Sequence, residues 1–466
     1  MFVGRTHELE ALERLYNRST FQMAVVYGRR RVGKTALLDE FSKDKRTLYF
    51  TAQQKSNSIN LQSFTQTVLQ FYGLPQIEAF STWEDALRFI ALREQAGDPM
   101  VFVFDELPYA AQAAPSLPST LQILIDHEFK QTNICMILCG SNEGFMESNV
   151  LGRKSPLYGR RNAQIKLLPF DCFDAALMMP GYTPQQCIEL YAMLGGTPYY
   201  LEQIDPNASI GENTERLFFD IAGLLYAEPQ MLLRQELREP ALYTSVLDAI
   251  ASGATAPKAI ANKAGVEETS VGKYLATLIG LDLIEKITPF EAGPRSRRSI
   301  YRIKDPFFAF WYRFVSPQIG AIEVGAGHAA AQMATGDAFS TYMGRQFETV
   351  CRQWLMRQSA AGSLPFLANY FGTWWGTDPV AKEQVDIDVI AATTLDKIAI
   401  VGECKWRESF NETEALDALM HRAALLGDYH IAQSILFTKN QVSKATAGKM
   451  RNDNDAIAVS ADELFE

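Results

Sequence analysis

Apolar runs without polar alternation recur in the first third of the chain. They lie at 21–27, 100–104 and 134–139, and a further strand is expected near 47–51. A strand exposed on one face alternates polar and apolar residues, so these runs indicate strands buried on both faces. Helical spacing fills the stretches between them. This order predicts an α/β domain over 1–165, with a parallel sheet covered by helices.

The hydrophobic pattern changes several times after this domain. Residues 166–240 have helical spacing and are expected to form a helical lid, with Thr183 as an N-cap. Residues 241–305 fit three short helices and two strands, the order of a winged helix-turn-helix. An alanine- and glycine-rich stretch lies in 306–337, the expected connector. Residues 338–466 are predicted to form a last α/β domain.

Residues 28–35 read Gly-Arg-Arg-Arg-Val-Gly-Lys-Thr and fit the phosphate-binding pattern G-x-x-x-x-G-K-[ST] at every fixed position. The glycines let the backbone turn tightly and aim its N–H groups at a polyphosphate. The lysine adds positive charge at the β- and γ-phosphates, and the threonine hydroxyl can ligate Mg²⁺. The three arginines are expected to flank the phosphates or to face solvent. The residues predicted to bind ATP here are Gly28, Arg29, Arg30, Arg31, Val32, Gly33, Lys34 and Thr35.

Two carboxylates follow the apolar strand at 101–104. Because α/β proteins bind ligands at the carboxyl ends of their strands, Asp105 is predicted to hold the Mg²⁺ shell and Glu106 to polarise the attacking water. The alternative is that the pair is a solvated helix cap. The strand at 134–139 ends close to Ser141, which either senses the γ-phosphate or belongs to an ordinary turn.

Arg160 follows a Tyr-Gly pair and is a candidate for stabilising negative charge on the γ-phosphate. An arginine in that place offsets the charge that develops during phosphoryl transfer. The alternative is an arginine in a surface loop.

The ordered set of motifs in 1–240 resembles the archaeal-type ATPases, which belong to the signal-transducing (STAND) branch of AAA+-related P-loop proteins. The resemblance implies that residues 2–5 pack near the adenine and that Pro198 lies in the helical lid over the nucleotide. Asn142 departs from the family, which usually has serine at that place. The segments that carry the resemblance are 2–9, 28–35, 105–106, 140–141, 157–160 and 195–198.

Charged residues interrupt two apolar strands near the C-terminus. The runs 385–391 and 397–406 predict a hairpin. Because side chains alternate along a strand, charged residues two apart lie on the same face of the sheet. Carboxylates that converge beside a lysine can hold a divalent metal and orient the water of a nuclease. The residues that share a face within each strand are Asp386 with Asp388, and Glu403 with Lys405.

This cluster resembles the PD-(D/E)xK restriction-endonuclease-like fold, and more narrowly the C-terminal domain attached to archaeal-type ATPases of this architecture. The resemblance implies that Asp388 is the aspartate of the motif, Glu403 and Lys405 its E-x-K, and Glu348 the helix glutamate. On this hypothesis Glu348, Asp388 and Glu403 bind Mg²⁺, and Asp388, Glu403 and Lys405 carry the catalysis. The alternative is a nuclease-shaped domain whose charges pair in a salt-bridge network.

The winged-helix pattern has a basic wing, which is the best candidate in the chain for contacts to phosphate. The candidate recognition helix begins with glutamates at 267–268, which repel phosphates. DNA binding and interdomain packing are therefore about equally supported. Aromatic residues at 307–314 are expected to form a packed seam rather than a platform for bases. The wing arginines are Arg295, Arg297 and Arg298, followed by Arg302.

The net charge of −10 over 466 residues argues against a surface that coats nucleic acid along its whole length. The six cysteines contain no C-x-x-C pair and the five histidines have no ligand spacing, so no zinc site is expected. No signal peptide or membrane span is expected either, which predicts a cytoplasmic protein without a membrane partner.

Two functions fit these patterns. The first is an ATP-driven protein that gates a metal-dependent nuclease acting on nucleic acid, with DNA favoured. The second is a nucleotide-controlled regulatory switch in which the last domain only scaffolds. Both need ATP and Mg²⁺ as cofactors, and a homo-oligomer is left open.

Overall fold

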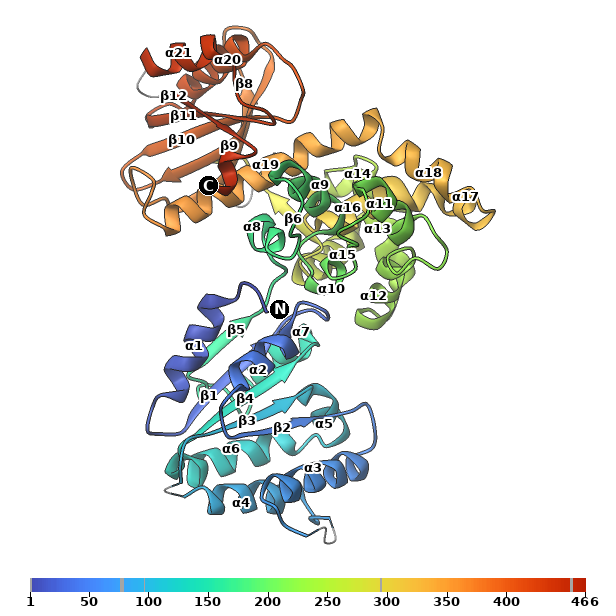
Figure 1. The fold of residues 1–466 in the computed structure, drawn as a ribbon, viewed down its shortest axis with the longest axis vertical. Helices are drawn as coiled ribbons and strands as arrows, with labels where there is room; N and C mark the ends of the chain where they lie inside the picture. Colours follow the sequence, from blue (N-terminus) through green and yellow to red (C-terminus); the bar gives the residue numbers. More distant parts are fainter. Residues whose placement is uncertain (1, 76–78, 96, 294–295, 453–455) are drawn as a thin grey trace. The chain divides into compact units, whose positions relative to one another are not determined.

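The chain forms two compact units, and its course can be followed in Figure 1. A three-residue piece of the expected lid belongs with the phosphate loop instead of with the rest of the lid. The first unit comprises Met1–Pro169 and Thr197–Tyr199, and the second comprises Phe170–Gly196 and Tyr200–Glu466. The computed structural model describes residues 2–75, 79–95, 97–293, 296–452 and 456–466.

A five-stranded sheet forms the centre of the first unit. Its strands are β1 (Gln22–Tyr27), β2 (Thr47–Thr51), β3 (Met100–Asp105), β4 (Ile134–Gly140) and β5 (Ala163–Lys166). The order is β2-β3-β4-β1-β5, and all neighbouring pairs are parallel. β1, β3 and β4 are buried at every residue. The predicted parallel sheet is therefore confirmed.

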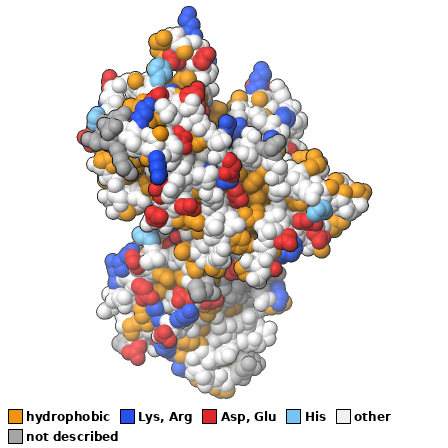
Figure 2. All heavy atoms as spheres, turned by 45° about the horizontal axis from the view of Figure 1, so that its top comes forward, with side chains coloured by type: hydrophobic (Ala, Val, Ile, Leu, Met, Phe, Trp, Pro, Cys, Tyr) orange, Lys and Arg blue, Asp and Glu red, His pale blue; other side chains and the backbone are white. Residues whose placement is uncertain are grey.

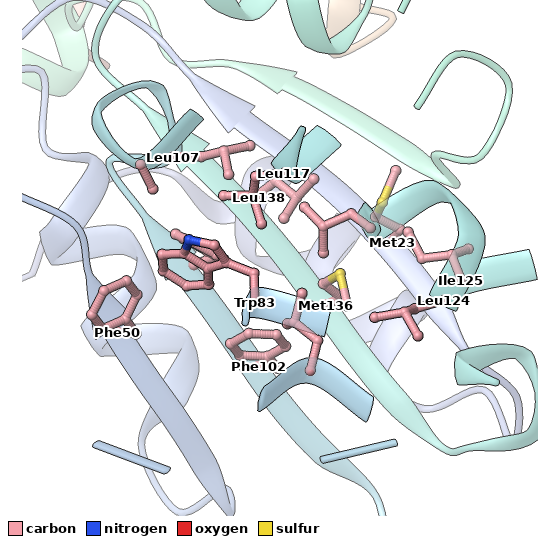
Figure 3. Packing of buried hydrophobic residues seen from close by; sticks show 14 of the residues in the cluster. Met23, Phe50, Trp83, Phe102, Leu107, Leu117, Leu124, Ile125, Met136 and Leu138 are labelled. Carbon is pink, nitrogen blue, oxygen red and sulfur yellow. The ribbon is translucent and has the colours of Figure 1, made fainter. Parts of the chain in front are cut away.

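Two apolar clusters hold helices against the two faces of this sheet. Alternate residues of β1 point to opposite faces, so Met23 belongs to one cluster and Ala24 to the other. Figure 3 shows Phe50, Trp83 and Phe102 packed in the first cluster. That cluster includes residues of α3 (Asn57–Phe71), α4 (Trp83–Arg93), α5 (Leu107–Ala113) and α6 (Leu117–His127), and the second includes residues of α1 (Thr6–Tyr16) and α2 (Lys34–Ser42).

The stretch after the sheet is helical, as its spacing predicts. Thr183 and Gln186 form a capping box at the start of α9, and Gly195 follows the last residue of that helix with a φ of +64°. A Cβ on Gly196 would lie 1.8 Å from the carbonyl oxygen of Phe170, so only glycine fits there. The helices are α8 (Cys172–Ala176), α9 (Pro184–Leu194), α10 (Pro198–Leu201), α11 (Ile210–Phe218) and α12 (Glu228–Glu236).

Three helices and a two-stranded antiparallel sheet come next. They are α13 (Pro240–Ala251), α14 (Pro257–Ala264), α15 (Glu268–Gly280), β6 (Ile284–Ile287) and β7 (Ile300–Ile303). The expected connector is largely helical, with α16 (Pro306–Phe310), α17 (Ile319–Glu323) and α18 (Gly327–Ala334). Alanine has the highest helix propensity, and Ala330, Ala331 and Ala334 are buried. The composition of this stretch therefore reflects close helix packing.

The aromatic residues that follow β7 are buried. The ring of Phe307 lies 4.8 Å from that of Tyr200 and 5.9 Å from that of Phe218, measured between centroids. The indole nitrogen of Trp311 donates a hydrogen bond to the carbonyl oxygen of Tyr226, at 2.8 Å. These rings form a packed seam with the preceding helices, so they offer no open platform for bases.

A mixed five-stranded sheet ends the chain. Its order is β12-β11-β10-β9-β8, and β9 pairs antiparallel with β10 as the predicted hairpin requires. β8 is also antiparallel to β9, whereas β10, β11 and β12 are parallel to one another. The elements are α19 (Asp337–Ala360), β8 (Tyr370–Thr377), β9 (Gln384–Thr393), β10 (Ile398–Lys405), α20 (Glu412–Ala423), β11 (His430–Thr438), α21 (Lys444–Asn452) and β12 (Ala456–Ser460).

The surface carries charges of both signs. On the face drawn in Figure 2, acidic and basic side chains are interspersed, and neither forms a continuous field. No helix within the described ranges is both long enough and apolar enough to cross a bilayer.

Replacing Phe64 by alanine is expected to destabilise the first unit by about 3–5 kcal/mol, because a buried aromatic side chain leaves a cavity behind. Phe64 is fully buried, and its ring packs against those of Phe50, Trp83 and Phe104. Urea unfolding followed by tryptophan fluorescence measures the change. The control is Ile59→Ala in the same helix, where the side chain is 47% exposed. Equal losses in the two variants would contradict this account of the core.

Candidate functional site

The phosphate-loop segment turns tightly between β1 and α2. Gly28, Arg31 and Gly33 have φ values of +154°, +70° and +90°, a conformation in which successive N–H groups can face an anion. A Cβ on Gly28 would lie 2.2 Å from the carbonyl oxygen of Leu167. Glycine is therefore required at the start of the loop both by conformation and by space.

Lys34 folds back over the loop. Its amino group donates to the carbonyl oxygens of Gly28, at 2.7 Å, and Arg29, at 2.9 Å. Burial lowers the pKa of this amino group, while the nearby carboxylates of Glu106 and Asp105 oppose the shift. The positive charge therefore lies where the β- and γ-phosphates of a nucleotide would be held. Thr35 is exposed at the first turn of α2, so its hydroxyl is accessible to a metal ion.

The arginines of the loop contact the short segment Thr197–Tyr199. Arg29 is buried, and its guanidinium donates to the hydroxyl of Thr197 at 3.2 Å. The guanidinium of Arg31 lies over the ring of Tyr199, 4.8 Å from its centroid. Pro198 lies between Thr197 and Tyr199 in the chain, and its Cγ is 3.7 Å from a Cβ built on Gly33. Pro198 is thus beside the loop, and the arginines position its neighbours.

Arg30 and Arg5 make further hydrogen bonds that hold the loop in place. Arg30 donates to the hydroxyl of Tyr109, at 2.5 Å, on helix α5. The guanidinium of Arg5 donates to the carbonyl oxygens of Val32, at 3.1 Å, and Leu168, at 2.6 Å. The N-terminal segment is therefore tied directly to the phosphate loop, and the packing of residues 2–5 near the adenine stays a prediction.

The carboxyl ends of β3 and β4 bring three predicted residues together. Glu106 has a φ of +50°, and its Oε2 accepts hydrogen bonds from the Ser141 backbone N–H, at 3.2 Å, and hydroxyl, at 2.9 Å. Asp105 is buried at the end of β3, where the hydroxyl of Tyr49 donates to its Oδ2 at 3.3 Å. Sequence reasoning missed Tyr49, because nothing in the motif marks a residue on the neighbouring strand. Asn142 caps α7 (Glu143–Phe145) through its side-chain oxygen.

The structure does not bring Arg160 to the phosphate loop of its own chain. Residue 160 precedes β5, which runs parallel to β1, whereas the loop follows β1. Arg160 and the phosphate loop therefore lie at opposite ends of these two parallel strands. Arg160 forms a two-pronged ion pair with Asp126, with a shortest distance of 2.5 Å. Charge stabilisation by Arg160 therefore stays a prediction, and in this structure its guanidinium is engaged with Asp126.

The residues of this first site fit ATP and Mg²⁺. A loop with left-handed residues and a buried lysine suits a polyphosphate, while Thr35 and Asp105 supply the hard oxygen atoms that Mg²⁺ prefers. Glu106 and Ser141 lie at the neighbouring strand ends. The predicted nucleotide residues therefore gather at one edge of the parallel sheet, with Arg160 as the exception.

The second candidate site lies on the C-terminal sheet and on α19. Gly402 pairs with Val389, so the register sets Glu403 opposite Asp388. Oδ2 of Asp388 accepts a hydrogen bond from the backbone N–H of Cys404, at 2.8 Å. Burial, together with the charges of Glu348 and Glu403, raises the pKa of Asp388 to about 8. Burial also raises the pKa of Glu348, although Arg302 and Arg345 oppose that shift.

Basic side chains form ion pairs with two of the carboxylates at this site. Glu403 is buried and pairs through one oxygen with Lys405 and through the other with Arg422, the latter at 2.8 Å. Glu348 lies 3.5 Å from Arg302. No group of three or more histidine, cysteine, aspartate and glutamate side chains in the described ranges is arranged to hold a metal ion. The oxygen donors are chemically suited to Mg²⁺, but their present arrangement is that of an ion-pair network.

A cavity of about 540 Å³ opens beside these carboxylates. Its lining comes mainly from β7, α19, β8 and β9, with further residues from α13, β6 and 309–313. Its carboxylates are Glu285, Glu348, Asp386 and Asp388. Its four basic residues are Arg302, Lys304, Arg313 and Arg345. The two predicted modules of this unit therefore share one charged cavity.

Two arginines of the predicted wing contact the last domain, one at strand β8 and one at helix α19. The guanidinium of Arg298 donates to the carbonyl oxygen of Trp375 at 3.3 Å, and Arg302 pairs with Glu348. Arg297 is exposed, and Arg295 lies outside the described residues. These contacts favour interdomain packing for part of the wing, while leaving Arg297 open to a ligand.

Two families match the chain. Residues 2–204 match an ATPase domain found predominantly in Archaea, and residues 311–416 match a family of archaeal and bacterial proteins of unknown function. The first match covers the whole phosphate site and the segment Thr197–Tyr199. The chain thus joins an ATPase domain to a second domain whose activity its family description leaves open.

Three proteins show how far the similarity extends. An uncharacterised protein of Methanocaldococcus jannaschii is 30% identical over 409 residues, which are 88% of this chain and 88% of that protein. An uncharacterised ATP-binding protein of the same organism is 50% identical over 46 residues, 10% of this chain and 78% of that protein. The Walker-type ATPase of Pyrococcus abyssi is 20% identical with a TM-score of 0.51, covering 67% of this chain and 96% of that one, and shares its fold.

Replacing Lys34 by alanine is expected to weaken ATP binding at least about tenfold, because a charge-assisted contact to the phosphates is lost. Equilibrium binding of a fluorescent ATP analogue measures the affinity. The control is Lys43→Ala, just after the same helix, where the lysine is exposed and pairs with Glu40. Unchanged affinity in Lys34→Ala would overturn the assignment of this loop.

Proposed function

The chain belongs to the family of archaeal-type ATPases that join this ATPase domain to the domain of unknown function, and on that premise we propose that it couples its nucleotide state to nucleic-acid binding and Mg²⁺-dependent cleavage in the C-terminal domain. The ATPase half of the proposal rests on the family match and on the geometry of the phosphate loop. The nucleic-acid half rests on the second unit.

The observation that carries this second half is the charged cavity. Three carboxylates on α19 and β9 face the same space as four basic residues. Guanidinium groups match the geometry of phosphate, and carboxylates match a divalent cation. A phosphodiester with its metal ion needs both kinds of group within one small volume. We infer that this cavity is where nucleic acid meets the C-terminal domain.

Each predicted residue has a defined task in this scheme. Bound Mg²⁺ would supply positive charge for the transferring phosphoryl group and a bound water as nucleophile. Glu348, Asp388 and Glu403 would hold it, and Lys405 would orient the water. Because Arg302 and Arg422 now neutralise two of these carboxylates, phosphate groups of a substrate would have to draw the arginines away first.

The alternative is a nucleotide-controlled switch with a catalytically silent C-terminal domain. The observation that favours it is the pairing of both oxygens of Glu403 with Lys405 and Arg422. Such a network stabilises the folded sheet without a metal. On this reading ATP controls only the binding of DNA, and no strand is cut.

Replacing Asp388 by asparagine is expected to lower Mg²⁺-dependent cleavage of labelled nucleic acid by at least about a hundredfold, because an essential anionic ligand is lost. ATP hydrolysis should stay unchanged, since the first unit keeps its residues. The control is Asp428→Asn, where the carboxylate is 83% exposed and pairs with Lys397. Cleavage assays use single-stranded, duplex and branched substrates. Nucleic-acid binding that responds to ATP, without cleavage of any substrate by the wild type, would select the switch.

Replacing Glu106 by glutamine is expected to leave ATP binding within about threefold while slowing hydrolysis by about 10²–10⁴-fold, because glutamine cannot accept the proton of the attacking water. Phosphate release and nucleotide binding are measured on the same samples. The control is Glu84→Gln, where the carboxylate is 50% exposed and pairs with Arg88. Equal hydrolysis rates in the two variants would remove Glu106 from the reaction.

A further inference from the structure

Three aromatic residues belong to the lining of the charged cavity, Tyr301, Tyr342 and Trp375, and Trp375 lies next to its carboxylates. Trp375 on β8 pairs with Asp386 on β9, so the two side chains emerge on the same face of the sheet. Both belong to the cavity lining, together with Asp388 and Glu348. The neighbouring Trp374 faces the other way and packs in the apolar cluster of the domain. Trp375 is only partly buried, and that apolar cluster does not include it.

The basic residues of the cavity are placed for an anion near this ring. Arg302 comes from β7 and contacts Glu348, whereas Arg313 and Arg345 are exposed residues on other elements of the lining. Planar guanidinium groups bind phosphate oxygen atoms in pairs. A ligand with a planar apolar part and a neighbouring phosphate would satisfy the indole and the arginines together.

The size of the cavity limits that ligand. A volume of about 540 Å³ is in the range of pockets that enclose a small molecule. Inside a duplex, both faces of a base are covered by neighbouring base pairs, so a side chain can stack on an internal base only after it has left the helix. The cavity therefore suits a nucleotide whose base is unpaired.

We propose that this cavity receives one unpaired nucleotide of a nucleic-acid strand, with its base stacked on Trp375 and its phosphate between the arginines and the carboxylates. The inference rests on the proposed function and adds a substrate class to it, single strands or unpaired strand ends. A free mononucleotide offers the same base and phosphate, but only a strand can extend beyond the cavity, for example toward exposed Arg297, whose neighbour Arg298 contacts the carbonyl oxygen of Trp375.

The test is equilibrium binding of fluorescently labelled oligonucleotides to the full chain in EDTA, so that no strand is cut. A short single strand, its blunt duplex and a strand of the same length with abasic sites are compared, with a mononucleotide as competitor. Wild type should bind the single strand about tenfold or more tightly than the duplex or the abasic strand, because stacking on an aromatic side chain is lost in both.

Trp375→Ala should weaken binding of the single strand by about tenfold, and Trp375→Phe should restore most of it, because the phenyl ring still stacks. The control is Val380→Ala, a substitution of an 85% exposed side chain between β8 and β9. The abasic comparison uses wild-type protein, so it remains decisive if Trp375→Ala folds poorly.

The outcomes separate this inference from the proposed function. Three outcomes would each overturn the unpaired-nucleotide site while leaving nucleic-acid binding intact. The first is tight binding that changes neither with Trp375 nor with abasic sites, and the second is a preference for the duplex. The third is competition by the mononucleotide as strong as that of the strand itself. Absence of binding to every oligonucleotide would instead reject the proposed function, and this inference with it.

Discussion

Strand β1 is hydrogen-bonded in parallel to β4 on one side and to β5 on the other, and every one of its residues is buried. A strand held in this way gives the loop that follows it a fixed starting point. The left-handed residues of that loop and the hydrogen bonds from Lys34 to its own carbonyl oxygens then set its shape. The strand ends that carry Asp105, Glu106 and Ser141 lie at the same edge because the sheet is parallel. The whole nucleotide site thus depends on the pairing of one buried strand.

Sequence patterns predicted most of this sheet because β1, β3 and β4 are largely apolar and buried at every residue, and because the motif has fixed spacing. The hairpin of the last domain was also predicted, since two apolar runs flank a short polar turn. Arg160 shows the limit of such reasoning. Its distance from the phosphate loop follows from the direction of β5, which no local pattern encodes. The contact of Glu106 with Ser141 needed the pairing of β3 with β4, which is equally invisible to spacing.

The C-terminal cluster shows a different limit. Alternation along two strands predicted which carboxylates share a face, and the register agrees with it. It did not predict Arg422, which reaches Glu403 from α20, or Arg302, which reaches Glu348 from β7. Both arginines lie far in sequence from the glutamates that they contact, and tertiary packing determines which carboxylate each one pairs with. Whether a carboxylate cluster is held ready for a metal or neutralised by its neighbours is therefore decided outside the motif.

The segment Thr197–Tyr199 has a consequence for the way the chain connects the two units. Helix α10 starts at Pro198, among residues of the first unit, and ends at Leu201, among residues of the second. Tyr199 and Tyr200 are neighbours in the chain, although Tyr199 belongs to the first unit and Tyr200 to the second. Tyr200 is buried against Phe307 and donates to Glu228 at 2.8 Å. One covalent crossing between the two units therefore falls inside a helical turn, between the ring that Arg31 contacts and a ring of the aromatic seam.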